Sequence, residues 1–109
     1  MTLHRVLIVV LGCFISFSSA LAAGAGSYPE RPLRLIVPFP PGGSNDVLSR
    51  FIGIKLSERI GQQVVIDNRA GANGIIGTEI AAHTTPDGYT LLINSTSYVM
   101  NAAVRKLPY

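Results

Sequence analysis

The sequence predicts an α/β protein in which a parallel sheet is flanked by helices. Three observations indicate this class. Short apolar stretches alternate with longer stretches of helical periodicity, the connections between them are short, and turns rich in Gly, Pro and Asn separate them. A strand–helix–strand–helix–strand order with short connections favours parallel strands joined by crossover helices.

The first 22 residues are expected to be a cleaved signal peptide. Arg5 supplies a positive charge, residues 6–17 are almost wholly apolar, and Ala20-Leu21-Ala22 presents small residues at the spacing that signal peptidase requires. A cut between Ala22 and Ala23 predicts export. The apolar stretch falls short of the roughly 20 residues of a membrane-spanning helix, which disfavours a retained anchor, and lipidation of Cys13 is a minor alternative.

Removal of residues 1–22 changes the cysteine count and the net charge of the protein. Cys13 is the only cysteine, so the remaining 87 residues contain no disulfide and no thiol chemistry. With Arg5 gone, eight basic residues stand against six acidic ones, a net charge of +2. The basic residues are too few and too scattered for a nucleic-acid surface.

The first strand and helix are expected at residues 33–37 and 45–60. Leu-Arg-Leu-Ile-Val is a strand sequence that the Pro- and Gly-rich run 38–43 ends. Ser44 is the predicted N-cap of the helix, and Gly61 is its predicted stop.

The face of this helix is predicted from its apolar spacing. An apolar stripe is expected to face the core, and Asp46 and Arg50 are expected to pair on the outer face. The stripe comprises Leu48, Ile52, Leu56 and Ile60, beside Val47, Phe51 and Ile54.

The second half of the chain repeats the plan. A strand at 63–67 is followed by a Gly/Asn loop at 68–74 and a helix from Ile75 to about His83, with Ile76, Ile80 and Ala81 facing inward. A turn at Pro86-Asp87-Gly88 precedes a third strand at 89–93. The polar loop Asn94-Ser95-Thr96-Ser97 then leads into a short helix from Tyr98.

These elements are too few to complete a parallel sheet protein. A parallel sheet needs helices on both faces, and three strands with two helices do not supply that cover. Residues 23–109 are therefore expected to form the N-terminal part of a first α/β domain, with a second domain absent.

Loops rich in glycine, hydroxyl and amide groups follow each strand. They occupy residues 39–45, 70–74 and 94–97. Because the carboxyl ends of parallel strands lie at one edge of the sheet, these loops are expected to meet there. Free N–H groups and the positive end of a helix bind anions, so the edge is a candidate anion site. Ordinary strand-to-helix turns use the same residues, which is the alternative for any one loop.

Catalytic and metal-dependent classes find no support in the sequence. Gly71, Gly74 and Gly77 have the spacing G-x-x-G-x-x-G rather than a dinucleotide fingerprint, and no phosphate loop is present. Ser44 lies outside a nucleophile elbow, and His83 is expected to be a C-terminal helix residue. No Cys/His/Asp/Glu cluster has metal-ligand spacing. The protein is therefore not expected to be an enzyme.

Three blocks of the sequence resemble one known family. Residues 28–46 (YPERPLRLIVPFPPGGSND), 65–77 (VIDNRAGANGIIG) and 86–92 (PDGYTLL) resemble the substrate-binding proteins of tripartite tricarboxylate transporters, the Bug family. The resemblance runs from Tyr28 to Tyr109. It implies a type II periplasmic-binding-protein fold with no cofactor and no catalysis. Its members run to about two full domains, whereas this chain ends inside the first.

The resemblance also implies a ligand and a set of binding residues. In this family the loops after the first and third strands hold a carboxylate, partly through backbone N–H groups. The positions that correspond here are Phe39, Pro40, Gly42, Gly43, Ser44, Asn45, Ser95, Thr96 and Ser97, with Ala72 and Asn73 as weaker candidates. Asp46 is expected to support the helix, because its carboxylate would repel an anionic solute.

Two functions fit this resemblance. In the first, the protein is a periplasmic receptor that captures a small organic carboxylate for the membrane permease of a tripartite tricarboxylate transporter. In the second, a ligand-sensing module of the same fold contacts a membrane sensor kinase.

Overall fold

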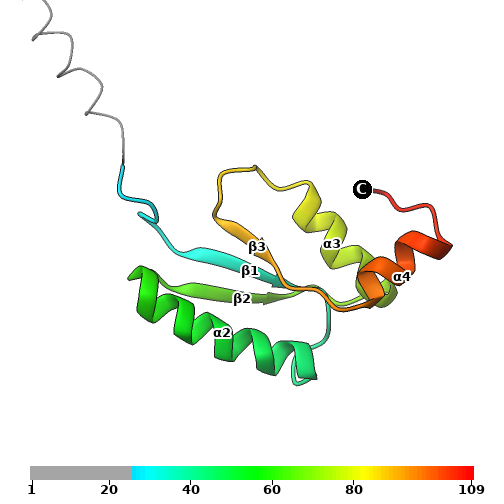
Figure 1. Ribbon diagram of the computed structural model, residues 1–109, viewed down its shortest axis with the longest axis horizontal. Coiled ribbons are helices and arrows are strands. Elements are labelled where there is room, and N and C mark those ends of the chain that lie inside the picture. The colour runs from blue at the N-terminus through cyan, green and yellow to red at the C-terminus, as the bar shows by residue number, and fades with distance from the viewer. Residues whose placement is uncertain (1–25) are drawn as a thin grey trace, which may run out of the picture.

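The computed structural model describes residues 26–109 (Figure 1). Its elements, in chain order, are β1 (Leu33–Val37), α2 (Ser44–Ile60), β2 (Val64–Asn68), the 3₁₀ turn η1 (Ala72–Gly74), α3 (Ile75–Ala82), β3 (Thr90–Leu92) and α4 (Ser97–Val104). The expected signal peptide at 1–22, its cleavage site and Cys13 lie outside the described residues. Among residues 26–109 no helix has the length and apolarity needed to cross a membrane.

The three strands form one parallel sheet with β1 in the middle. The strand order is β2-β1-β3, with Leu33 opposite Val64 and Leu35 opposite Leu91. The α/β class and the parallel sheet predicted from the sequence are confirmed. β1 has the predicted bounds, whereas β2 lies one residue later than predicted because Gln63 contributes only its carbonyl, which accepts from Leu33 N at 2.8 Å.

Two helices lie on opposite sides of the sheet in Figure 1. α2 packs along β1 and β2, and α3 packs against β1 and β3. The core is a small cluster at the middle of the sheet. It comprises Leu33, Leu35 and Val64, with Leu56, Ile60, Ile66, Tyr89, Leu91 and Ile93 packed against it.

The predicted orientation of α2 is wrong for most of its apolar stripe. The residues that it buries are Asp46, Ser49 and Gly53. Side chains at a four-residue spacing drift by about 40° per step around a helix of 3.6 residues per turn. Leu56 and Ile60 therefore reach the core, whereas the earlier members of the stripe have turned away. Five apolar side chains of α2 are exposed by between 39% and 62%: Val47, Leu48, Phe51, Ile52 and Ile54.

Small residues set the distance between the helices and the sheet. A Cβ added at Gly77 of α3 would lie 2.6 Å from Pro38 Cβ and 2.7 Å from the carbonyl oxygen of Arg69. Gly77 and Thr78 are the buried residues of α3, while Ile76 is 45% exposed. The prediction that Ile76 faces inward is therefore wrong, because the face of α3 that packs closely on the rest of the protein is the one that carries Gly77. Ile80 and Ala81 are half-buried.

Candidate functional site

The three loops after the strands meet at the carboxyl edge of the sheet (Figure 1). Gly74, at the end of the second loop, lies between the other two. A Cβ placed on Gly74 would lie 3.4 Å from Phe39 Cζ and 3.7 Å from Asn94 Oδ1. Its φ of +90° is a left-handed angle that favours glycine. The structure therefore brings the candidate loops together around one glycine.

Asp46 anchors the first loop. Its Oδ2 accepts hydrogen bonds from Gly42 N at 2.9 Å and Arg50 Nε at 3.0 Å, and its Oδ1 accepts from Asn68 Nδ2 at 3.0 Å. Asn68 Nδ2 also donates to Phe39 O at 3.2 Å. The side chain of Arg50, followed by Gly42 N–H and Asn68, lowers the pKa of Asp46 to about 2.

Asp46 is only 3% exposed, so it supports the loop and helix as predicted. The predicted pair with Arg50 also forms, but its location is wrong. Asp46 lies on the buried side of α2 because the end of β2 and the first loop both bond to it. Hydrogen-bond donors within the protein thus stabilise the negative charge of the Asp46 carboxylate.

The first turn of α2 presents free donors. The helix begins at Ser44 with Gly43 at the N-cap, and no side chain caps it, so the prediction that Ser44 is the N-cap is wrong. Gly43 occupies the N-cap because the Asp46 carboxylate accepts a hydrogen bond from Gly42 N and so holds the loop just before the helix. Val47 N, at 3.0 Å from Gly43 O, is the first to bond backward. Within residues 26–109 the N–H groups of Ser44, Asn45 and Asp46 have no acceptor, as is usual for a first helical turn.

The second loop is a run of left-handed backbone that contacts α4. Ala72 and Asn73 have φ of 47° and 56°, between Gly71 at 141° and Gly74 at 90°. Asn73 Nδ2 donates to Asn101 Oδ1 at 3.3 Å, and Asn101 Nδ2 donates to Asn73 O at 3.0 Å. The side chain of Asn73, a weaker ligand candidate, therefore bonds within the protein.

The third loop is held by its own side chains. Ser95 Oγ and Ser97 Oγ lie 2.8 Å apart, and Ser97 N donates to Ser95 Oγ at 3.3 Å. Asn94 Oδ1 accepts from Ser95 N at 2.9 Å, while Asn94 Nδ2 donates to Thr78 Oγ1 at 2.9 Å. α4 begins at Ser97, one residue before the predicted start.

All nine main candidates lie on the two loops or on the first residues of the helices that follow. Exposed at this edge are Pro40, Gly42, Ser44 and Thr96, and half-buried are Phe39, Gly43, Asn45, Ser95 and Ser97. Sequence reasoning did not assign a positioning role to three amides: Asn68, Asn94 and Asn101. Each makes a hydrogen bond to a residue at least 16 positions away in the chain, which local sequence patterns do not indicate.

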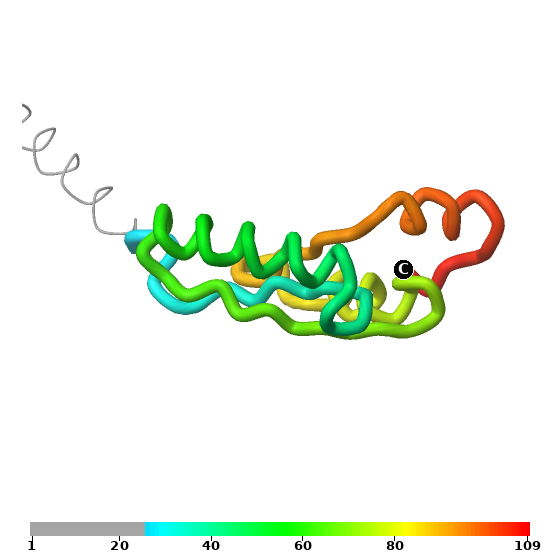
Figure 2. Tube along the Cα trace, turned by 90° about the horizontal axis from the view of Figure 1, so that it is seen from below, coloured from blue at the N-terminus to red at the C-terminus, as the bar shows by residue number. Residues whose placement is uncertain are grey.

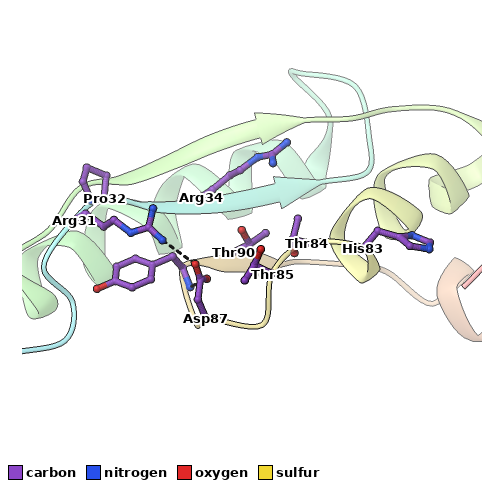
Figure 3. Close-up of a pocket in the computed structure, with 9 residues that line it drawn as sticks. Arg31, Pro32, Arg34, His83, Thr84, Thr85, Asp87 and Thr90 are labelled. Carbon is purple, nitrogen blue, oxygen red and sulfur yellow. Dashed lines mark hydrogen bonds and ion pairs between the residues drawn. The ribbon is translucent and has the colours of Figure 1, made fainter. Parts of the chain in front are cut away.

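Two concavities in the described part lie elsewhere. The one in Figure 3 is at the amino edge of the sheet, where Arg31 pairs with Asp87 at 2.7 Å and lies 4.2 Å above the Tyr89 ring. The other is a groove between α2 and β2 that includes Gly53 and Ile66. No group of three or more metal-ligating side chains gathers within residues 26–109.

His83 borders the concavity of Figure 3 as the C-cap residue of α3. Its backbone N donates to Glu79 O at 3.1 Å, which confirms the C-terminal helix role predicted for it.

Comparison with known proteins gives a consistent result. The profile of a family described as "Tripartite tricarboxylate transporter family receptor" matches residues 48–109. Protein BugT of Bordetella pertussis is 46% identical over 103 residues, which cover 94% of this chain and 32% of BugT.

Solved structures of similar proteins match the fold closely. A structure described as a periplasmic transporter is 45% identical to this chain, with a TM-score of 0.70. The match covers 75% of this chain and 28% of the transporter chain. MatC from Rhodopseudomonas palustris, solved with bound malate, is 33% identical with a TM-score of 0.69, covering 75% of this chain and 29% of its own. The chain thus spans a third or less of the length of these proteins.

Proposed function

The chain belongs to the family of tripartite tricarboxylate transporter receptors, and on that premise we propose that its carboxyl-edge loops bind a carboxylate group of a small organic acid. The family is a solute-binding receptor family rather than an enzyme family, in agreement with the sequence prediction. The fold is that of periplasmic binding proteins of this type, as the structural neighbours show.

The first turn of α2 is the observation that carries the proposal. Its N–H groups at Ser44, Asn45 and Asp46 have no acceptor among the described residues, and they lie at the positive end of a 17-residue helix. A carboxylate placed there accepts hydrogen bonds without displacing any internal acceptor. The buried Asp46 carboxylate bonds to three donors, so its charge is balanced locally.

The hydroxyl groups of the third loop supply the neighbouring contacts. Thr96 is exposed. The Ser95 and Ser97 hydroxyls bond to each other, and Ser95 Oγ also accepts from Ser97 N, which leaves some donor and acceptor capacity on these oxygens. We assign residues 39–45 and 95–97 to one wall of the site. Malate, which is bound to the related MatC, carries a carboxylate of this kind and is the probe used in the tests below.

The cellular role follows from the same family. We propose that residues 1–22 direct export and are removed, that residues 23–109 form the N-terminal part of a first α/β domain, and that the receptor delivers its ligand to a membrane permease. Periplasmic relatives support this location. The intact mass of the periplasmic product tests the processing step, and a product that retains Met1 contradicts it.

A malate titration of the full chain followed by amide NMR tests the binding site. We expect the Ser44 and Asn45 amide resonances to shift, and Gly43→Val to weaken binding by more than about tenfold because its side chain covers the donors. Gly43 has φ of −76° and no atom closer than 3.5 Å to an added Cβ, so the variant is expected to fold.

Thr85→Val serves as the matched control at the amino edge, since Thr85 lines the concavity of Figure 3. Shifts confined to that concavity, or unchanged affinity in Gly43→Val, would place the ligand elsewhere.

A further inference from the structure

The position of α4 is set by a polar contact rather than by apolar burial. Both views place α4 beyond the carboxyl edge of the sheet (Figure 1 and Figure 2), where it packs against η1. Asn101 is 4% exposed, which makes it the one buried residue of this eight-residue helix. The large apolar side chains of α4 are exposed by between 44% and 73%: Tyr98, Val99, Met100 and Val104.

Two amides join α4 to the second loop. Asn101 Nδ2 donates to the backbone carbonyl of Asn73 at 3.0 Å, and Asn73 Nδ2 donates to Asn101 Oδ1 at 3.3 Å. Asn73 has φ of 56° and ψ of 39°, a left-handed conformation that asparagine adopts more readily than most residues. A buried amide without partners costs about 1–3 kcal/mol, so the buried Asn101 side chain favours the position in which both bonds form.

The same turn also holds the other end of the third loop. Thr78 Oγ1 donates to Gly74 O at 2.7 Å and accepts from Asn94 Nδ2 at 2.9 Å. Asn94 begins the third loop, and Ser97 begins α4. The loop between them is therefore tied to residues 72–74 twice, through Asn94 before it and Asn101 after it.

We propose that Asn101 is a positioning residue of the carboxylate site. It holds α4 against the second loop and thereby sets the hydroxyls of Ser95 and Ser97 relative to the first turn of α2, without contacting the ligand. Its effect on the third loop rests on the hydrogen bonds of Asn94 and Asn101, and its consequence for affinity rests on the proposed function.

Two substitutions separate the bonds of the pair. Asn101→Asp keeps the side-chain shape and an acceptor oxygen but removes the donor to Asn73 O. Asn73→Gly keeps that carbonyl and the left-handed backbone but removes the 3.3 Å bond. Val99→Ala is the matched control, because Val99 lies on the same helix and is 68% exposed.

The first measurement is amide NMR with hydrogen exchange on the full chain without ligand. In Asn101→Asp we expect the Ser95, Thr96 and Ser97 amide signals to move and to exchange about tenfold faster, with smaller changes in Asn73→Gly and none in Val99→Ala. The Leu35 signal in β1 reports whether the sheet stays folded. Loop signals that match those of Val99→Ala in both variants overturn the proposal. If Asn101→Asp unfolds the sheet, Asn73→Gly alone decides.

The second measurement is malate affinity by titration calorimetry. We expect Asn101→Asp to raise Kd by roughly tenfold and Val99→Ala to leave it within about twofold. If the loop signals move but affinity does not fall, Asn101 positions the loop without serving the site, and the proposal is wrong. If wild type binds no malate while the loop signals move as expected, the proposed function fails and the positioning of the loop by Asn101 stands.

Discussion

The buried Asp46 carboxylate shapes the first loop of the candidate site through its hydrogen bonds. Three donors converge on its oxygens from the first loop, from α2 and from β2. An ionised acceptor with several hydrogen bonds is strongly favoured over its protonated form. Because Gly42 N–H is one of these donors, the bond fixes the loop directly before the first turn of α2, where the Ser44 and Asn45 N–H groups have no acceptor among the described residues. The candidate site therefore depends on the charge state of the Asp46 side chain, which the proposed ligand does not contact.

The pH dependence of stability tests this role. The pKa of Asp46 is lowered from 3.8 to about 2 in the folded chain, chiefly by Arg50. Its contribution to stability is fully present above the unfolded pKa and is lost as pH falls from about 4 to about 2. Asp46→Asn should therefore destabilise the protein at pH 7 and make urea midpoints less dependent on pH below about 4.

Asp67, whose pKa is also lowered, serves as the comparison. Partial burial opposes its ionisation, but hydrogen bonds from Arg34 and Arg69 hold its pKa below the usual value. Asp67→Asn should keep the pH response of Asp46. Parallel pH curves for wild type and Asp46→Asn would show that Asp46 does not carry this linkage.

At the scale of elements, local signals located the strands and helices, but not the face that each helix buries. β1 matched its predicted bounds because a short segment with four apolar residues, interrupted by Arg34, lies between Pro32 and Pro38. α2 is apolar around most of its circumference, so periodicity alone did not choose among its faces. α2 buries the face that carries Ser49 and Gly53, because their small size lets the helix approach the sheet.

The same distinction applies to the candidate site. Glycine and proline marked the first loop, since turns require them locally. The amides that hold the loops remained hidden, because Asn101 meets Asn73 only after the chain has folded. Contacts across 28 residues leave no local pattern that sequence reasoning detects.

Close packing at Gly77 gives a direct test at this scale. An added Cβ would lie 2.6 Å from Pro38 Cβ and 2.7 Å from Arg69 O, so Gly77→Ala must move the helix or the first loop. We expect a loss of about 1–3 kcal/mol in unfolding free energy, although alanine favours a helix by up to about 1 kcal/mol. Thermal unfolding followed by circular dichroism measures the change.

Gly43→Ala is the control for Gly77→Ala, because its Cβ would meet only Pro40 O at 3.5 Å. We expect it to lower the melting temperature less than Gly77→Ala does, because alanine is a poorer N-cap than glycine but meets no close contact here. A higher melting temperature for Gly77→Ala than for wild type would show that helix propensity outweighs the contact.

At the scale of the whole molecule, the outer face of α2 exposes several large apolar side chains. Val47, Leu48, Phe51, Ile52 and Ile54 form it, and each is at least 39% exposed. Monomeric soluble proteins rarely expose contiguous apolar surface of this kind. Most of the length of the similar proteins lies outside the region that this chain matches. By itself, the chain leaves this face open to contact with other copies.

This face predicts self-association of the chain, in which apolar burial between copies provides the driving force. Phe51 is 62% exposed, so Phe51→Glu removes apolar surface and adds a charge without disturbing the core. We expect this variant to weaken self-association by at least about tenfold at an unchanged melting temperature. Leu56→Glu is the contrast, because Leu56 packs against the core and a charge there should unfold the protein. Sedimentation velocity across a concentration series measures the association. A wild-type chain that stays monomeric at high concentration, or equal association in Phe51→Glu, would mean that the α2 face does not drive contact between copies.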